Sequence, residues 1–243
     1  MTVENADEQI EAVLTALDRD PRIDTQHHSL RVYLQDDHLV LEGAVANIAA
    51  KKLAVKAARG VWGPHPLMDR LRVVASKPAT DGVLRDEVVH VICGEPAYAD
   101  YTLRIKRDDG FETLHQGGDD SHGNIMMEVH QGTVSLSGDV GSLSHRRLAE
   151  VLVWWTAGCE VVHNRLKVVP AEEENDGELA DALYMVLEKD PLVHAGQLSV
   201  QVRDGVVVLD GYVASEEERR LAELDAWYVP GVVDVVDQIK TRG

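Results

Sequence analysis

Pairs of adjacent basic residues recur at one aligned position of the chain, and they are the side chains whose chemistry is easiest to name. They are Lys51-Lys52, Arg146-Arg147 and Arg219-Arg220. Ammonium and guanidinium groups donate hydrogen bonds to phosphate and carboxylate oxygens, so the pairs indicate binding of phospholipid head groups or of an acidic protein partner. The alternative is a solvated helix face on which these cations pair with nearby acidic residues.

Metal-binding side chains gather in one Gly-rich segment of the middle of the chain. They are His115, Asp119, Asp120 and His122. Imidazole and carboxylate groups bind zinc and other divalent metals, but a structural site needs a closed set of ligands, and Gly-rich acidic segments are usually solvated loops. These residues are therefore weak candidates, and we predict neither a bound metal nor a cofactor.

Catalytic motifs are missing from the sequence. His90 and Cys93 lie three residues apart on an expected helix, as a base and a nucleophile would, but no third group or oxyanion site accompanies them. The chain contains no Gly-x-Ser-x-Gly, no His-Glu-x-x-His and no phosphate-binding Gly-rich loop. We predict that the protein is not an enzyme; a hydrolase or thiol enzyme is the least favoured class.

The composition of the chain limits which kinds of partner it can bind and indicates the compartment in which it works. A formal net charge of −18 over 243 residues excludes sequence-independent attraction to nucleic acid, which needs an excess of Lys and Arg. No run of apolar residues is long enough for a transmembrane helix, and residues 1–8 do not resemble a signal peptide. Two cysteines do not make a disulfide framework, so we expect a cytoplasmic protein. The oligomeric state stays open.

Six glycines at fixed spacing show that the chain repeats one pattern three times. Each copy has an apolar run that ends in Leu, one polar residue, Gly, one residue and Val, and a second glycine follows 20 positions later. The glycines are Gly43, Gly63, Gly138, Gly158, Gly211 and Gly231. We interpret them as structural positions, where the chain turns or where backbone segments approach closely. Six residues after the second glycine stands Asp69, Asn164 or Asp237.

The pattern around these glycines predicts a helix, two strands, a second helix and a last strand in each copy. Alternating apolar residues, a turn and a return strand indicate a hairpin before the first glycine. Asn47, Ser142 and Ser215 each stand where they cap the second helix. Asp81 and Asp176 look like the N-caps of the first helices of the second and third copies.

We therefore predict an α+β fold of three tandem αββαβ units, each a three-stranded mixed sheet packed against two helices. The expected bounds are 1–76, 81–169 and 176–243, and short Pro-containing linkers separate them. The middle unit is longer, so we expect an inserted hairpin and loop at about 101–123. Aromatic residues that end the second helices, Trp154-Trp155 and Trp227-Tyr228, indicate contact between units or, alternatively, a ligand or membrane-contact patch.

This arrangement of strand, glycine, cap, basic pair and final strand resembles the BON domain, named for bacterial osmotically inducible and nodulation proteins. The likeness is clearest at Val207–Val213 and Pro230–Asp237, and Gly158–Asn164 also matches well. In three copies it covers nearly the whole chain. The resemblance implies the αββαβ fold and a non-enzymatic binding or scaffold role. It also implies contact with phospholipid surfaces or protein partners during envelope or osmotic stress.

A second hypothesis belongs to a different class of function. The net charge of −18 and the acidic runs Glu172-Glu173-Glu174 and Asp119-Asp120 favour cations over anions as ligands. On this reading the chain is a cytoplasmic sensor of a cation or small ligand.

Overall fold

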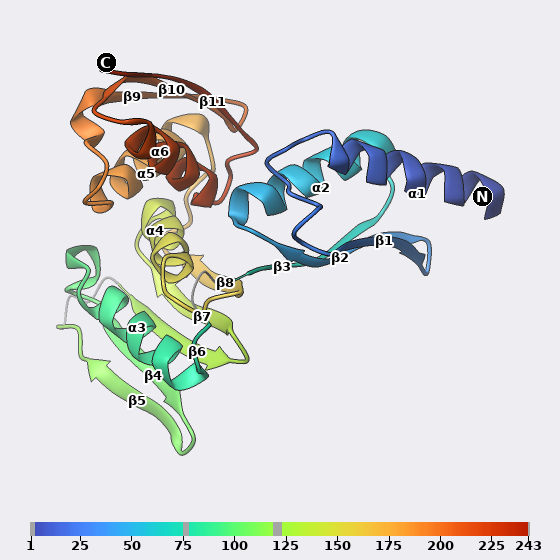
Figure 1. Ribbon diagram of the computed structural model, residues 1–243. Coiled ribbons are helices and arrows are strands. Elements are labelled where there is room, and N and C mark those ends of the chain that lie inside the picture. Colours follow the sequence, from blue (N-terminus) through green and yellow to red (C-terminus); the bar gives the residue numbers. More distant parts are fainter. Residues whose placement is uncertain (1–2, 75–77, 119–122, 243) are drawn as a thin grey trace. The chain divides into compact units, whose positions relative to one another are not determined.

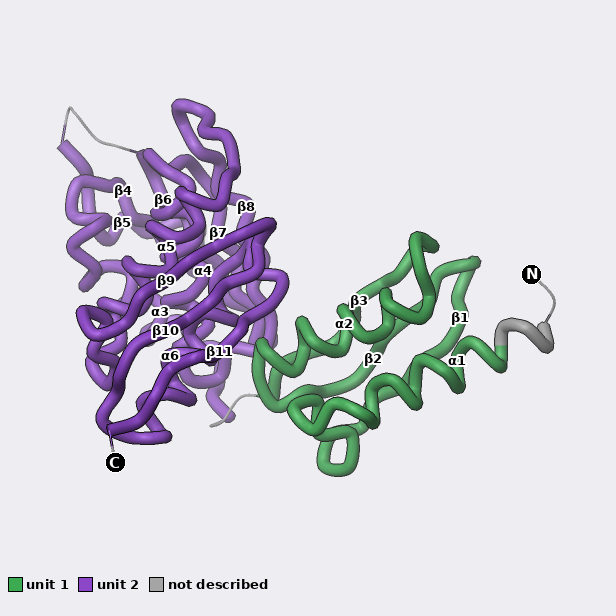
Figure 2. Tube along the Cα trace, turned by 90° about the horizontal axis from the view of Figure 1, so that it is seen from above, with its two compact units in different colours: residues 1–75 green, residues 76–243 purple. Residues whose placement is uncertain are grey.

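The computed structural model describes residues 3–74, 78–118 and 123–242 (Figure 1). The chain divides into two compact units, residues 1–75 and residues 76–243, which Figure 2 shows in green and purple. Unit 1 holds one copy of the repeated pattern and unit 2 holds the other two.

Unit 1 is a three-stranded sheet with two helices packed against it. In order along the chain its elements are α1 (Val3–Asp18), β1 (Leu30–Gln35), β2 (His38–Val45), α2 (Ile48–Trp62) and β3 (Leu67–Val73). The strand order is β1-β2-β3, with β1 antiparallel and β3 parallel to the central strand. Both helices lie over the same face of this sheet (Figure 1). Leu39, Leu41 and Val45 of β2 are buried in the core between the two layers.

Unit 2 contains the second and third repeats of the same order of elements. The second repeat has α3 (Asp81–Cys93), a 3₁₀ turn η1 (Pro96–Tyr98), β4 (Thr102–Arg107), β5 (Gly110–His115), β6 (Asn124–His130), β7 (Thr133–Val140), α4 (Leu143–Trp154) and β8 (Val161–Val168). The third has α5 (Asp176–Lys189), η2 (Ala195–Gln197), β9 (Leu198–Arg203), β10 (Val206–Val213), α6 (Glu216–Tyr228) and β11 (Asp234–Thr241). Three αββαβ repeats in an α+β fold are therefore present, as the sequence predicts.

The sheet of the second repeat carries two strands more than the other two sheets. Its order is β5-β4-β6-β7-β8, whereas the third repeat has β11-β10-β9. The additional strands form an antiparallel hairpin, and β4 pairs in parallel with β6. The three strands common to all repeats thus keep the predicted arrangement, and the hairpin extends the middle sheet at the edge that β6 would otherwise leave open.

The first glycine of each repeat lies where two strands approach too closely for a side chain. The φ angles of Gly43, Gly138 and Gly211 are 135°, 117° and 139°. A Cβ atom at these glycines would lie 2.1, 2.3 and 2.2 Å from the backbone oxygens of Ser29, Asn124 and Gln197, respectively. Both the backbone angle and the space therefore require glycine at the end of the hairpin.

Helix caps agree with the sequence at three helices and differ at two. Asn47, Ser142 and Ser215 cap α2, α4 and α6, as predicted. Thr80 and Asn175 cap α3 and α5, so the expectation for Asp81 and Asp176 is wrong.

The two aspartates instead hold the hairpin turn of their own repeat. The carboxylate of Asp81 accepts hydrogen bonds from the backbone N–H of Gln131 (2.7 Å) and of Gly132 (3.0 Å). Asp176 makes the same pair of bonds, to Asp204 (2.8 Å) and Gly205 (3.1 Å). These backbone donors lower the pKa of Asp81. Because the turn comes from a distant part of the sequence, a residue beside a helix start looks like a cap.

Candidate functional site

In the first and third repeats, the first member of the basic pair connects the second helix to the last strand. Lys51 Nζ lies 2.6 Å from the carbonyl oxygen of Leu71 and 3.4 Å from Asp69 Oδ2. In the third repeat Arg219 Nε donates to Asp237 Oδ2 at 2.7 Å. The pairing with Asp237 raises the pKa of Arg219. These cations therefore stabilise the contact between helix and sheet. In the second repeat the side chain of Arg146 lies instead 3.8 Å from Oε1 of Glu174, which stands between β8 and α5.

The aligned Asp or Asn completes this connection through the backbone. Asp69 Oδ1 and Asp237 Oδ1 accept from the N–H groups two residues further on, each at 2.9 Å. In the second repeat Asn164 accepts from Leu166 N–H and donates to the carbonyl oxygen of Arg146 at 2.8 Å. Residues that the sequence marks as a repeated polar set thus bind one another within the fold.

The second members of the pairs have different surroundings. Arg147 is buried, pairs with Glu178 and donates from Nε to the carbonyl oxygen of Pro230 at 2.8 Å. Burial lowers the pKa of Arg147. Arg220 is exposed and pairs with Glu217 on its own helix at 2.7 Å. Arg147 therefore joins the second repeat to the third, and ligand binding by the pairs stays a prediction that these contacts do not test.

Helix α2 carries two cations in addition to the pair Lys51-Lys52. The helix contains Lys51, Lys52, Lys56 and Arg59 and no acidic residue. Lys52, Lys56 and Arg59 follow one another at spacings of four and three, which places them on one side of the helix. The buried residues of α2, Leu53, Ala54 and Ala58 among them, lie on the side that faces the sheet. This spacing is visible in the sequence, so the cationic side of α2 could have been predicted without the structure.

The candidate metal ligands are not brought together in the part of the chain that is described. His115 ends β5, whereas Asp119, Asp120 and His122 lie outside the described residues. Within residues 3–74, 78–118 and 123–242, no group of three or more His, Cys, Asp or Glu side chains is arranged to hold a metal ion.

Both cysteines are free thiols with pKa values that oppose nucleophilic use. Partial burial raises the pKa of Cys93, which lies at the end of α3. Burial raises the pKa of Cys159 to about 12. An activated cysteine needs the opposite shift, toward the thiolate. His90 and Cys93 therefore have the spacing of a catalytic pair without its chemistry.

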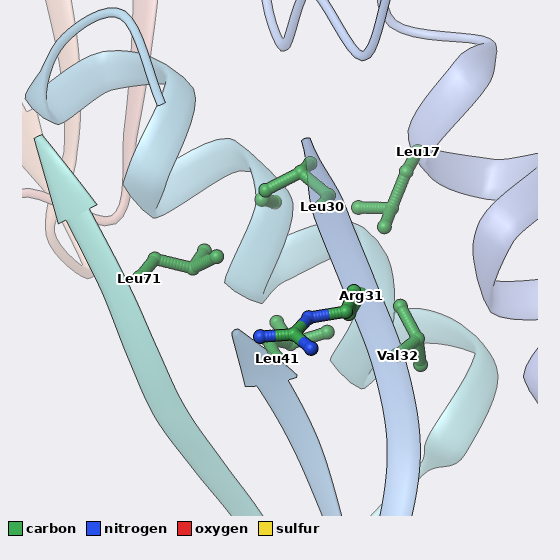
Figure 3. A pocket seen from close by; sticks show the side chains of 7 residues that line it. Leu17, Leu30, Arg31, Val32, Leu41 and Leu71 are labelled. Carbon is green, nitrogen blue, oxygen red and sulfur yellow. The ribbon is translucent and has the colours of Figure 1, made fainter. Parts of the chain in front are cut away.

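Hollows in the two units are either closed or lined by charged groups. In unit 1 a hollow between α1 and the sheet is lined by Leu17, Leu30, Leu41 and Leu71, and it has no room for a water molecule (Figure 3). In unit 2 an open hollow of about 240 Å³ lies beside Arg147, Glu174 and Gly231. Neither has the enclosed apolar walls typical of a small-molecule site.

Aromatic side chains at the ends of α4 and α6 make a contact between repeats. The ring centroids of Trp154 and Tyr228 lie 6.5 Å apart. Trp227 is buried, with 1% of its surface exposed. The prediction that these residues serve contact between repeats is confirmed for Trp154 and Tyr228.

Comparison with known protein families decides the family of this chain. The model of the BON domain matches residues 5–75, 112–170 and 175–243. The chain belongs to the BON domain family. The second BON match begins within β5, so α3 and β4 lie outside it. The first match begins two residues inside α1 and covers the rest of its repeat, and the third includes every element of its repeat.

A curated protein is similar in sequence to part of this BON protein. Osmotically-inducible protein Y of Escherichia coli (strain K12) is 30% identical over 125 residues, which cover 49% of this chain and 62% of the relative. The match thus spans less than two thirds of the relative's length.

Solved structures also show a distant likeness. The C-terminal domain of CdsD, the structural protein of the type III secretion system of Chlamydia trachomatis, is 14% identical, with 96% of this chain and 97% of that chain covered. The TM-score is 0.25, and a second CdsD structure has 0.23. Likeness at this level carries no argument about function.

None of the described helices is long and apolar enough to cross a membrane.

Proposed function

We propose that this BON protein is a non-catalytic binding or scaffold protein of the osmotic or envelope stress response, which contacts phospholipid surfaces or protein partners. Membership of the BON family and the likeness to an osmotically inducible protein support the stress-related role. In this proposal three repeats with the bounds 1–76, 81–169 and 176–243 form the scaffold. The free thiols of Cys93 and Cys159 support a reducing, cytoplasmic compartment.

The observation that carries the proposal is the charge of α2. A chain with a formal net charge of −18 contains a 15-residue helix that has four cations and no acidic residue. Lys56 and Arg59 are exposed on that helix. Cations near an anionic membrane surface contribute about 1 kcal/mol each, so such a helix supports contact with anionic head groups or an acidic protein surface. The contact is local, because the rest of the chain is acidic.

Reversal of charge on α2 is expected to remove this contact. The change is Lys52→Glu with Lys56→Glu and Arg59→Glu in the full chain. Three reversed charges should weaken binding to vesicles of phosphatidylglycerol and phosphatidylcholine at least about tenfold, since each cation contributes about 1 kcal/mol. Vesicle flotation, with pure phosphatidylcholine as the neutral reference, measures the change.

The matched control reverses three exposed cations outside α2. Arg165→Glu, Lys167→Glu and Lys240→Glu change the net charge by the same amount and should leave most of the binding intact. Equal losses in both triple variants would show that only total charge matters and would contradict a role for α2. If neither chain floats with anionic vesicles, affinity capture from a native lysate tests the protein-partner branch, where only the α2 variant should lose its partner.

The alternative function is a sensor of a cation or small ligand. The described ranges contain no cluster of three or more metal-binding side chains that would support it. No observation on those residues favours it over a binding protein.

A further inference from the structure

Strand β1 has backbone groups that point away from its own sheet. The turn at Asp36-Asp37 joins Gln35 to His38, and a two-residue turn makes that pair a hydrogen-bonded one. Pairs alternate along an antiparallel ladder, so Val32, opposite Leu41, is not hydrogen-bonded to β2. The N–H and C=O groups of Val32, and likewise of Leu30 and Leu34, therefore face the outer edge of β1.

In the other two repeats, backbone groups on this edge have partners of two different kinds. In the second repeat β4 pairs with β6 in parallel, and Ile105 lies opposite Met127, which is aligned with Val32. In the third repeat the N–H of Val200, at the same aligned position, donates to the hydroxyl oxygen of Tyr184 on α5 at 3.0 Å. A whole strand thus pairs with the edge in one case, and a tyrosine hydroxyl accepts from its central N–H group in the other.

The first repeat has neither cover within the described residues. Strand β1 is an edge strand of its sheet, and the position aligned with Tyr184 is Leu14 of α1, whose side chain has no hydroxyl group. Leu14 is 38% exposed.

Apolar side chains on β1 are correspondingly less buried than their counterparts. Leu30 and Val32 are half-buried, whereas the aligned Ile125 and Met127 are fully buried beside β4. Leu30 and Val32 lie with Leu17 around the hollow between α1 and the sheet (Figure 3). Both the backbone and the side chains of β1 are therefore left as they would be in the second repeat without its hairpin.

We infer that the outer edge of β1 binds an extended strand of a partner protein, which adds to the sheet parallel to β1. The β4–β6 pair provides the model: Leu103 and Ile105 of the added strand are buried, and Arg104 between them faces the other side, beside Met126. The residue aligned with Met126 is Arg31, which donates to Glu42 of β2 at 2.8 Å. Its side chain is 71% exposed, so other N–H groups of the guanidinium can donate to a second carboxylate. The strand that fits β1 therefore has an acidic residue between two apolar ones. This inference goes beyond the proposed contact through α2 and does not depend on it.

A peptide derived from β4 tests the inference. The probe is a fluorescein-labelled peptide with the sequence of residues 101–107 in which Glu replaces Arg104, titrated with the full chain and followed by fluorescence anisotropy. We expect saturable binding, and weaker binding of the unchanged peptide, which keeps its arginine opposite Arg31. Absence of binding by the acidic peptide up to millimolar protein would overturn the inference.

Leu14→Tyr is the decisive variant, because it places at β1 the hydroxyl group that Tyr184 supplies at β9. It should weaken peptide binding at least tenfold and leave circular dichroism and anionic-vesicle flotation unchanged. The matched control is Val89→Tyr, at the aligned position of the repeat whose edge β4 already covers. It should leave peptide binding as it is, and equal affinity of the Leu14→Tyr variant and the unmodified chain would overturn the inference.

Tyr184→Phe provides a second, independent variant. It removes the hydroxyl group that accepts from Val200, so the edge of β9 should gain affinity for the peptide and the stoichiometry should rise toward two. Sedimentation of the chain without peptide tests the other possible occupant of this edge, a second copy of the chain. Self-association that Leu14→Tyr abolishes would identify a second copy of the chain on this edge and would overturn the assignment to a partner strand.

Discussion

Asp225→Asn is expected to raise the free energy of unfolding by about 4 kcal/mol at pH 7, because it removes a carboxyl group that the fold keeps protonated. Asp225 lies on α6 with 3% of its surface exposed. Burial first, and then the neighbouring carboxylate of Asp190 at the end of α5, raise the pKa of Asp225 to about 8. Its Oδ2 atom has no hydrogen-bond partner, as suits a neutral carboxyl.

The dependence on pH follows from the two states of this group. In the unfolded chain Asp225 loses its proton near its ordinary pKa of 3.8, and in the folded chain near 8. Between these values the folded state holds one proton more, so stability falls as pH rises, by about 1.4 kcal/mol per unit. The asparagine variant lacks this slope, and its advantage should be small at pH 4 and largest above pH 8.

Neighbouring groups do not offset this effect. Tyr228, on the same helix, has its pKa raised to about 12 by burial and stays neutral in this range. Lys189, next to Asp190, pairs with Glu95 at 2.7 Å. Urea unfolding at pH 5, 7 and 9 measures the difference between the two chains. The control is Asp181→Asn, at an exposed position of α5, which should change little. A pH-independent difference between the Asp225 variant and the unmodified chain would contradict the explanation.

Gly138→Ala is expected to lower the free energy of unfolding of unit 2 by about 3 kcal/mol or more. The added Cβ would lie 2.3 Å from the backbone oxygen of Asn124, across the β6–β7 pair. The backbone angle φ of 117° is itself unfavourable for alanine. The clash involves backbone on both strands, so no side chain can move aside to relieve it.

Thermal unfolding followed by circular dichroism measures this loss. A loss of that size should lower the melting temperature by about 10 °C for a unit of this length. Gly196→Ala is the matched control, because a Cβ there meets no atom within 4 Å. A Gly138→Ala variant that melts with the control would show that the strands can separate at no cost, contrary to the role of the glycine in closing the hairpin.

Local patterns in the sequence predicted most of the architecture. Alternation, capping residues and the glycines that close the hairpins act over short stretches of the chain, so they specify the order of helix, strand, strand, helix and strand. Three of the five caps were correct for this reason. The prediction that Asp81 caps α3 was wrong because its hydrogen-bond partners, Gln131 and Gly132, are 50 and 51 residues away in the chain.

The candidate site was predicted less well than the fold. Alignment drew attention to the basic pairs, yet Lys51 and Arg219 contact the last strand of their own repeat, and Arg147 is buried against the third repeat. Which face of a helix a cation occupies, and which acid lies near it, depends on packing between elements far apart in the chain. Alignment preserves the position of a residue and says nothing of its partner.

By itself, the sequence determined that this protein repeats one αββαβ pattern three times, since periodicity and turn chemistry are local properties of the chain. Only the tertiary structure decided which repeated positions differ in use. Leu14 and Tyr184 are aligned apolar-stripe residues in the sequence, but Leu14 has no hydroxyl group, whereas that of Tyr184 accepts from the N–H of Val200 on the edge strand β9. Likewise, nothing in the sequence distinguishes Asp225 from other acidic residues, and only its burial in the fold, with Asp190 beside it, raises its pKa. The physical reason is the same in both cases: hydrogen bonding and ionisation depend on what surrounds a group in space.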